Sequence, residues 1–197
     1  TARNKQISIN GFWMDATEIT NNEYRQFVNW VRDSTAAVKM QLGKEVDGVF
    51  SVDWKNAQTI KWNDKSTVEK IDAMILSPEN RVFSKKDLDP TKLIYHSETF
   101  DLKEAARRDN ASKPRSQFIV KKDIPIYPDT LIWIRDFSYS YNEPMTKRYF
   151  SHPAFGNYPV VGVNWKQATA FCEWRTHYLN SFLELKKRAT ESDFRLP

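Results

Sequence analysis

The chain contains the stretch EITNNEYRQFV at residues 18–28, which carries the start signal of a helix and its first apolar turns. Thr20 and Glu23 have the spacing of a capping box, in which each side chain accepts a hydrogen bond from the other residue's backbone N–H. We therefore expect a helix over residues 20–33. The apolar positions that repeat at helical spacing are Tyr24, Phe27, Val28 and Val31.

Residues 6–19 precede this helix and are rich in Ile, Phe, Trp and Thr. Their composition predicts a strand, interrupted at the turn dipeptide Asn10-Gly11. The apolar residues on which this prediction depends are Ile7, Ile9, Phe12 and Met14.

A second helix signal lies near the other end of the chain. Residues 159–163 are a short apolar run, for which we expect a strand. Asn164 and Gln167 then have capping spacing, and we expect a helix over residues 164–187. The positions at helical spacing are Ala168, Phe171, Cys172, Arg175, Tyr178, Leu179 and Phe182.

The intervening chain is less regular. Residues 36–126 are interpreted as an insertion, with a strand near Val49, Val52 and Trp54 and a short helix capped by Ser66 before Pro78. We expect Asp101 to cap another short helix reaching about residue 108. The composition of residues 131–134 predicts a strand. It lies among the loops of residues 127–159, which we expect to be held by aromatic packing. The loop aromatics are Tyr127, Trp133, Phe137, Tyr139, Tyr141, Tyr149, Phe150, Phe155 and Tyr158.

The net charge of +5 is concentrated in one place. Residues 103–122, called here the basic segment, hold seven cations against Glu104 and Asp109, so the remainder of the chain is neutral. Such a patch attracts an acidic protein, anionic lipid or nucleic acid, although a solvated loop is an equally simple interpretation. The predicted partner-binding residues are Arg107, Arg108, Lys113, Arg115, Lys121 and Lys122; Lys103 completes the seven.

The composition further limits the classes of protein to which the chain can belong. With 40% hydrophobic and 28% charged residues in 197, the chain is globular, and no apolar run approaches the roughly 18 residues of a membrane span. A single cysteine, Cys172, excludes an internal disulfide and a cysteine-based zinc site. We expect Cys172 to be a small buried residue on the apolar side of its helix.

Few other residues suggest chemistry. His96, His152 and His177 are scattered, and Asp15, Glu18 and Asp33 are better explained by helix electrostatics than by paired catalytic carboxylates. Phosphate-loop, dinucleotide-binding, nucleophile-elbow and nucleic-acid-binding motifs are absent from the sequence. From the residues alone, we expect an α+β, loop-rich domain with no catalytic residue, metal site or cofactor, and no nucleic-acid partner.

Three segments resemble the formylglycine-generating-enzyme (sulfatase-modifying factor) family. Residues 11–28 are similar to its opening motif, residues 159–174 to its Pro-Val-x-x-Val-Ser-Trp strand and helix, and residues 194–197 to the start of a later motif. The resemblance implies an irregular fold related to C-type lectins. Since residues 194–197 match only the beginning of that motif, the domain is expected to be incomplete at the C-terminus.

Within that family, the chain is more similar to the K-type gliding-motility lipoproteins, the PorK-type ring components of the type IX secretion system. The supporting stretches include residues 27–34, 88–90, 127–130, 139–145 and 149–154. This resemblance implies a non-catalytic subunit on the periplasmic side of the outer membrane. It would be held there by a lipid anchor and would form a ring with copies of itself and an N-type partner.

One departure from the family bears on catalysis. The family's enzymes hold copper with a pair of cysteines, whereas these residues contain only Cys172, which matches a core position. A formylglycine-generating or related oxygenase-type enzyme with its site beyond residue 197 is the first alternative. A carbohydrate- or peptidoglycan-binding module that uses the aromatic loops is the second.

Overall fold

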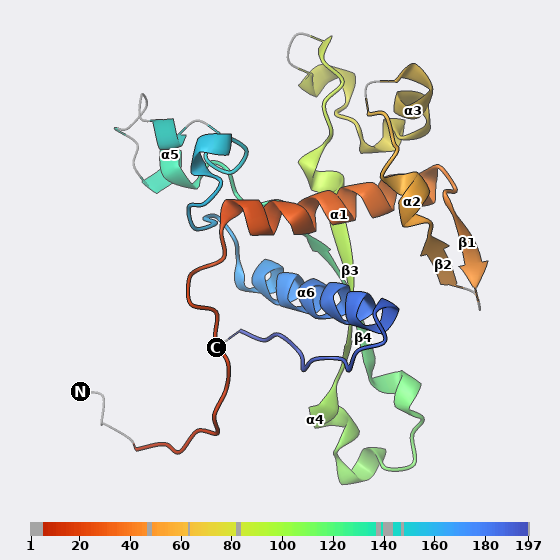
Figure 1. The fold of residues 1–197 in the computed structure, drawn as a ribbon, viewed down its shortest axis with the longest axis vertical. Coiled ribbons are helices and arrows are strands. Elements are labelled where there is room, and N and C mark those ends of the chain that lie inside the picture. Colours follow the sequence, from red (N-terminus) through yellow and green to blue (C-terminus); the bar gives the residue numbers. More distant parts are fainter. Residues whose placement is uncertain are drawn as a thin grey trace.

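Two long helices and a long hairpin form the centre of the molecule (Figure 1). A computed structural model describes residues 6–46, 49–62, 64–81, 84–136, 139, 144–146 and 148–196. Helices α1 (Asn21–Lys39) and α6 (Trp165–Leu185) pack against each other, and α6 also contacts the strands β3 (Ile94–Phe100) and β4 (Ile119–Pro125). The fold is α+β and rich in loops, as the sequence predicts.

The capping box predicted for α1 is present. Glu23 Oε2 accepts a hydrogen bond of 2.8 Å from the backbone N–H of Thr20, and Thr20 Oγ1 accepts one of 3.3 Å from that of Glu23. The helix continues six residues past the predicted end, because Ala36 and Ala37 are buried and extend its packed face. Asn164 and Gln167 form the second predicted capping box, at the start of α6.

Phe27 lies at the centre of the core and is 0% exposed. Four aromatic rings surround it, with centroids 5.3 to 5.9 Å away. This arrangement joins α1, β3 and α6 in one aromatic cluster, whose edge-to-face and tilted contacts add to the hydrophobic burial. The surrounding rings belong to Tyr24, Tyr95, Phe171 and Trp174.

The buried Tyr24 hydroxyl donates a hydrogen bond of 2.9 Å to the carbonyl of Ile126, and burial raises the pKa of this phenol. Leu93, Tyr95 and Ile124 are buried in the same hydrophobic cluster as Tyr24. The later part of residues 36–126 therefore contributes to the core of this molecule. Whether those residues are an insertion relative to other members of the fold remains a prediction.

The remaining elements are short. Strands β1 (Gly43–Val46) and β2 (Val49–Val52) form a small antiparallel hairpin, separate from the β3–β4 hairpin. The other α-helices are α2 (Trp54–Ala57), α3 (Lys65–Lys70), α4 (Leu102–Ala105) and α5 (Ile132–Asp136). The 3-10 helices are η1 (Asp72–Met74), η2 (Pro78–Asn80), η4 (Pro90–Lys92), η5 (Arg108–Asn110), η6 (Arg115–Phe118), η7 (Pro144–Thr146) and η8 (Pro153–Phe155).

Two predicted strands are wrong. Residues 6–15 are exposed and pair with no strand in the described chain, because their strand-like composition meets no neighbouring backbone. Residues 131–134 lie instead at the start of α5. Asp129 redirects this segment, since its Oδ1 accepts a hydrogen bond of 2.9 Å from the N–H of Leu131 and its Oδ2 lies 2.8 Å from Arg135 Nη2.

Three smaller expectations also need correction. Trp54 begins helix α2 rather than extending a strand, because Asp53 caps it. Helix α3 begins after Asp64, two residues earlier than a Ser66 cap would give. The run 159–163 makes only an isolated bridge, between Pro159 and Thr20. By contrast, Asp101 caps α4 as predicted, with a 3.0 Å hydrogen bond from the N–H of Glu104, although the helix ends at Ala105 and not near residue 108.

Gly162 explains why that run cannot form a regular strand. Its φ is +81°, in the left-handed region, and a Cβ added there would lie 2.3 Å from the carbonyl oxygen of Asp129. The Gly162 carbonyl accepts a hydrogen bond of 2.8 Å from the N–H of Asp129. Only glycine allows this turn and close approach together. Among the helices that the structure describes, none has the length and apolarity needed to cross a bilayer.

Candidate functional site

A groove of about 350 Å³ lies between α1 and α6. It is lined mainly by apolar side chains, with Glu23 on one side and Arg175 on the other. Ile19 of the N-terminal segment, residues 6–19, and Phe194 of the C-terminal segment, residues 186–196, also contribute to its lining. The apolar lining includes Ile19, Phe171, Trp174, Tyr178, Phe182 and Phe194.

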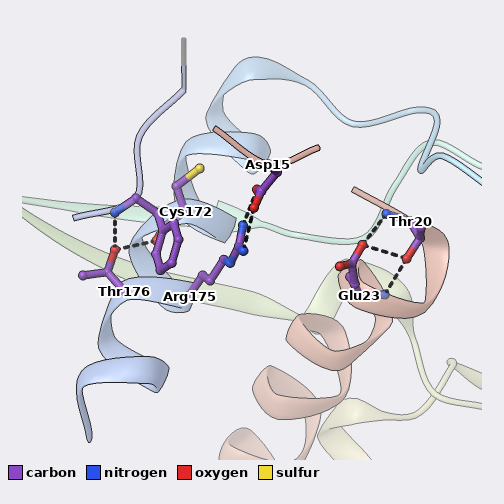
Figure 2. A network of polar contacts seen from close by, with 7 residues as sticks. Asp15, Thr20, Glu23, Cys172, Arg175 and Thr176 are labelled. Atoms are coloured by element: carbon purple, nitrogen blue, oxygen red, sulfur yellow. Dashed lines mark hydrogen bonds and ion pairs between the residues drawn. The ribbon is translucent and has the colours of Figure 1, made fainter. Parts of the chain in front are cut away.

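Arg175 holds both of these segments on α6. Its two terminal nitrogens lie 2.6 and 3.0 Å from the two carboxylate oxygens of Asp15, as Figure 2 shows. The same guanidinium carbon lies 4.1 Å from the centroid of the Phe194 ring. The hydrogen bonds to Arg175 lower the pKa of Asp15, and those to Asp15 raise the pKa of Arg175.

Thr176 supplies a second attachment for the C-terminal segment. Its Oγ1 donates a hydrogen bond of 2.9 Å to the carbonyl of Cys172 and accepts one of 2.9 Å from the N–H of Phe194 (Figure 2). The groove therefore depends on contacts between residues more than 150 positions apart in sequence, together with local contacts on α6. No local sequence pattern predicts the pairing of Asp15 with Arg175.

Large apolar side chains are exposed both in the N-terminal segment and on α6. In the N-terminal segment, Trp13 is fully exposed (102%), and on α6 Tyr178 and Phe182, which also line the groove, are about half exposed. Exposed apolar side chains that gather on a surface mark interaction sites. The residues concerned are Ile7, Ile9, Phe12, Trp13 and Met14 in the segment, and Tyr178, Phe182 and Leu185 on α6.

The basic segment lies elsewhere, on an extension of the β3–β4 hairpin that includes α4 (Figure 1). Arg107 Nη1 lies 3.2 Å from Glu104, and Lys121 Nζ lies 2.6 Å from Glu98. In the described chain, the other cations of the segment form no ion pair, and all are exposed: Lys103, Arg108, Lys113, Arg115 and Lys122. The structure thus places the predicted residues on one extension of the hairpin, but at different points along its length.

A hollow of about 500 Å³, called here the basic hollow, opens beside these cations. Phe100 and Ile119 face each other across the β3–β4 register and contribute to its wall with Leu102, Arg115 and Ser116. Sequence reasoning missed this feature. The exposed apolar residues occur at the ends of two strands, and only the pairing of those strands brings them together.

The aromatic loops fulfil their predicted packing role in part. Phe150 is buried against Tyr24 and Tyr127, and Tyr149 packs against Phe155. Tyr139 and Tyr158 are exposed. Phe137 and Tyr141, named with them in the prediction, lie outside the described residues.

Comparison with known proteins identifies the family. The family model described as the sulfatase-modifying factor enzyme 1-like domain matches residues 2–197. The chain belongs to this family. No curated protein and no solved structure shows significant similarity to the chain.

The copper site of the enzymes in the sulfatase-modifying factor family needs two cysteines, and these 197 residues contain one. Cys172 is half-buried rather than fully buried as predicted. Burial raises the pKa of its thiol, Arg175 lowers it by a smaller amount, and Asp15 raises it. Its surroundings thus favour a protonated thiol, so the residues present do not fit that copper site.

The other residues considered for a catalytic or metal-binding role are dispersed over this sulfatase-modifying factor domain. Asp15 pairs with Arg175, Asp33 pairs with its neighbour Arg32 at 2.7 Å, and Glu18 is exposed. His96 Nδ1 lies 2.6 Å from Asp123, and His152 accepts a hydrogen bond from the N–H of Ala154. His177 is exposed. The described part of the chain contains no group of three or more His, Cys, Asp or Glu residues placed to hold a metal.

Proposed function

We propose that this sulfatase-modifying factor domain is a non-catalytic structural subunit of a type IX protein secretion and gliding-motility complex. In this proposal it forms a periplasmic ring at the outer membrane with copies of itself and an N-type partner, and a lipid anchor holds it there. The observation that carries the proposal is the presence of two different exposed surfaces suited to protein contacts: the apolar residues of the N-terminal segment and α6, and the basic segment.

Ring assembly makes a particular demand on a subunit. Head-to-tail contacts in a closed ring use two different patches on each copy, because one patch binds the complementary patch of its neighbour. The apolar surface and the basic segment are chemically distinct, so they can serve different neighbours. The likeness of residues 127–130 and 149–154 to the K-type lipoproteins supports the same proposal.

The half-buried thiol allows a test of thiol chemistry within these residues. An enzyme that used the thiol of Cys172 would need it, whereas a structural subunit needs Cys172 only as a small residue on α6. Serine has nearly the same volume, so Cys172→Ser should preserve the packing of this helix. The variant therefore separates a thiol-dependent role from a structural one.

The test is genetic and biochemical. Deleting the gene should abolish secretion of type IX cargo and gliding, and both wild type and Cys172→Ser should restore them. The N-type protein should copurify with the full-length protein from outer-membrane extracts. Normal secretion after deletion would overturn the proposal. So would a Cys172→Ser protein that is present at wild-type levels in the membrane but fails to restore secretion.

A further inference from the structure

The basic hollow combines three chemical features in a small area. Its wall is apolar through Phe100, Leu102 and Ile119, and Leu102 is 70% exposed. Arg115 forms part of the same wall and has no ion-pair partner among the described residues. Residues 103–122 beside it have a net charge of +5, part of which Glu98 on the paired strand offsets through its ion pair with Lys121.

We infer that the basic hollow binds an acidic segment of a partner protein through one bulky apolar side chain of that segment. The side chain enters the hollow against Leu102, Phe100 and Ile119. Carboxylates next to it in sequence pair with Arg115 and Arg108. This inference specifies the partner of a surface included in the proposed function, and in that respect rests on it.

The charges select an acidic ligand. Arg108 and Arg115 are exposed and unpaired within the described chain, so binding a carboxylate breaks no existing ion pair of theirs. The arginine guanidinium is planar and can hold a carboxylate through two parallel hydrogen bonds. Arg107 and Lys121 differ, because each already pairs with a glutamate of the extension.

The arrangement of charges favours a protein segment over a membrane surface. Glu98, Glu104 and Asp109 also lie among the cations, and a broad anionic surface would meet them along with the arginines. A narrow segment can place its carboxylates beside the cations alone.

Binding of a defined peptide to the full chain tests the inference. The probe is a short fluorescein-labelled peptide of alternating Asp and Glu with one central phenylalanine, and the matched probe has alanine at that position. Anisotropy should show the phenylalanine peptide binding roughly tenfold more tightly, since an aromatic side chain leaves water. Affinity for both should fall as the screening length shortens from about 10 Å at 0.1 M salt to about 3 Å at 1 M.

Two variants separate the contributions of charge and shape. The double variant Arg108→Glu/Arg115→Glu should weaken both peptides by roughly tenfold or more, because it replaces attraction by repulsion. Leu102→Gln should remove the preference for phenylalanine while keeping the salt dependence. The control Lys70→Glu/Lys166→Glu makes the same charge change at exposed positions outside the extension and should bind like wild type.

Equal binding of the two peptides to the wild-type chain would overturn the inference. Absence of peptide binding would also overturn it, and so would preferential binding of the chain to vesicles containing an anionic phospholipid. These assays need no secretion machinery, so their failure is distinct from the failure of the gene-deletion test of the proposed function. Circular dichroism of each variant checks that a loss of binding is not a loss of fold.

Discussion

Arg175 and Asp15 are separated by 160 positions in sequence and are joined by two hydrogen bonds, of 2.6 and 3.0 Å. The pair attaches the N-terminal segment to α6, next to the ring of Phe194. An exposed ion pair usually contributes at most about 1 kcal/mol to stability. Its role here is to position a segment, so its removal should affect local order more than global stability.

Asp15→Asn should release the N-terminal segment. Backbone order parameters of residues 13–19, measured by NMR relaxation, should fall, while the free energy of unfolding should fall by no more than about 1 kcal/mol. Asp193→Asn is the control, because Asp193 also pairs with an arginine, Arg195, but only two residues away at 3.4 Å. Unchanged order parameters in Asp15→Asn would show that the pair does not hold the segment.

The same pair should respond to acid. The pKa of Asp15 is lowered from its ordinary value of 3.8 in the folded chain, so its contribution to stability is present above that value. It is lost as the pH falls through the lower folded-state pKa. Between neutral pH and pH 5, the order parameters of residues 13–19 should exceed those in Asp15→Asn by a constant amount, and below about pH 4 the difference should shrink. A loss of that difference near neutral pH would contradict the assignment.

Gly162→Ala should destabilise the fold. The added Cβ would meet the Asp129 carbonyl, and φ at this position is positive, so we expect a loss of more than about 1 kcal/mol in urea denaturation. Gly11→Ala is a matched control, since no atom lies within 4 Å of the Cβ it would add. Equal stability of the two variants would show that the approach of Asp129 to Gly162 relaxes without cost.

Cys172 should react slowly with thiol reagents. Burial raises its pKa above the ordinary value of 9.0, and the thiolate is the reactive form. At pH 8 the native chain should therefore be labelled more slowly than the same chain in urea. The pH midpoint of labelling in the native chain should lie above 9.0. Equal rates in the native and unfolded chains would contradict this prediction.

Local signals explain which parts of the fold the sequence could predict. Both long helices begin at capping boxes whose partners are three residues apart, so their starts were predictable from Thr20 and Asn164. A strand depends instead on a distant partner, and residues 6–15 have the composition without a neighbouring strand in the described chain. Asp129 likewise converts the β-prone run 131–134 into the start of a helix.

The candidate surfaces likewise divide into features that local sequence predicts and features that depend on the fold. The cations of the basic segment were identified from charge alone, because they are close together in sequence. The basic hollow was not, since Phe100 and Ile119 become neighbours only through the β3–β4 register. The pairing of Arg175 with Asp15 requires α6 to pack beside the start of the chain, which no short sequence pattern specifies.

The packing of α1 against α6 has a consequence for how the protein is made. The aromatic face of α1 is complete once residue 39 has been synthesised, but its partner rings Phe171 and Trp174 follow more than 130 residues later. At ordinary translation rates this delay is on the order of ten seconds. During that interval the nascent chain presents Tyr24 and Phe27 without their cover, so a holdase chaperone that recognises aromatic helices should bind residues 21–39 before the chain is complete.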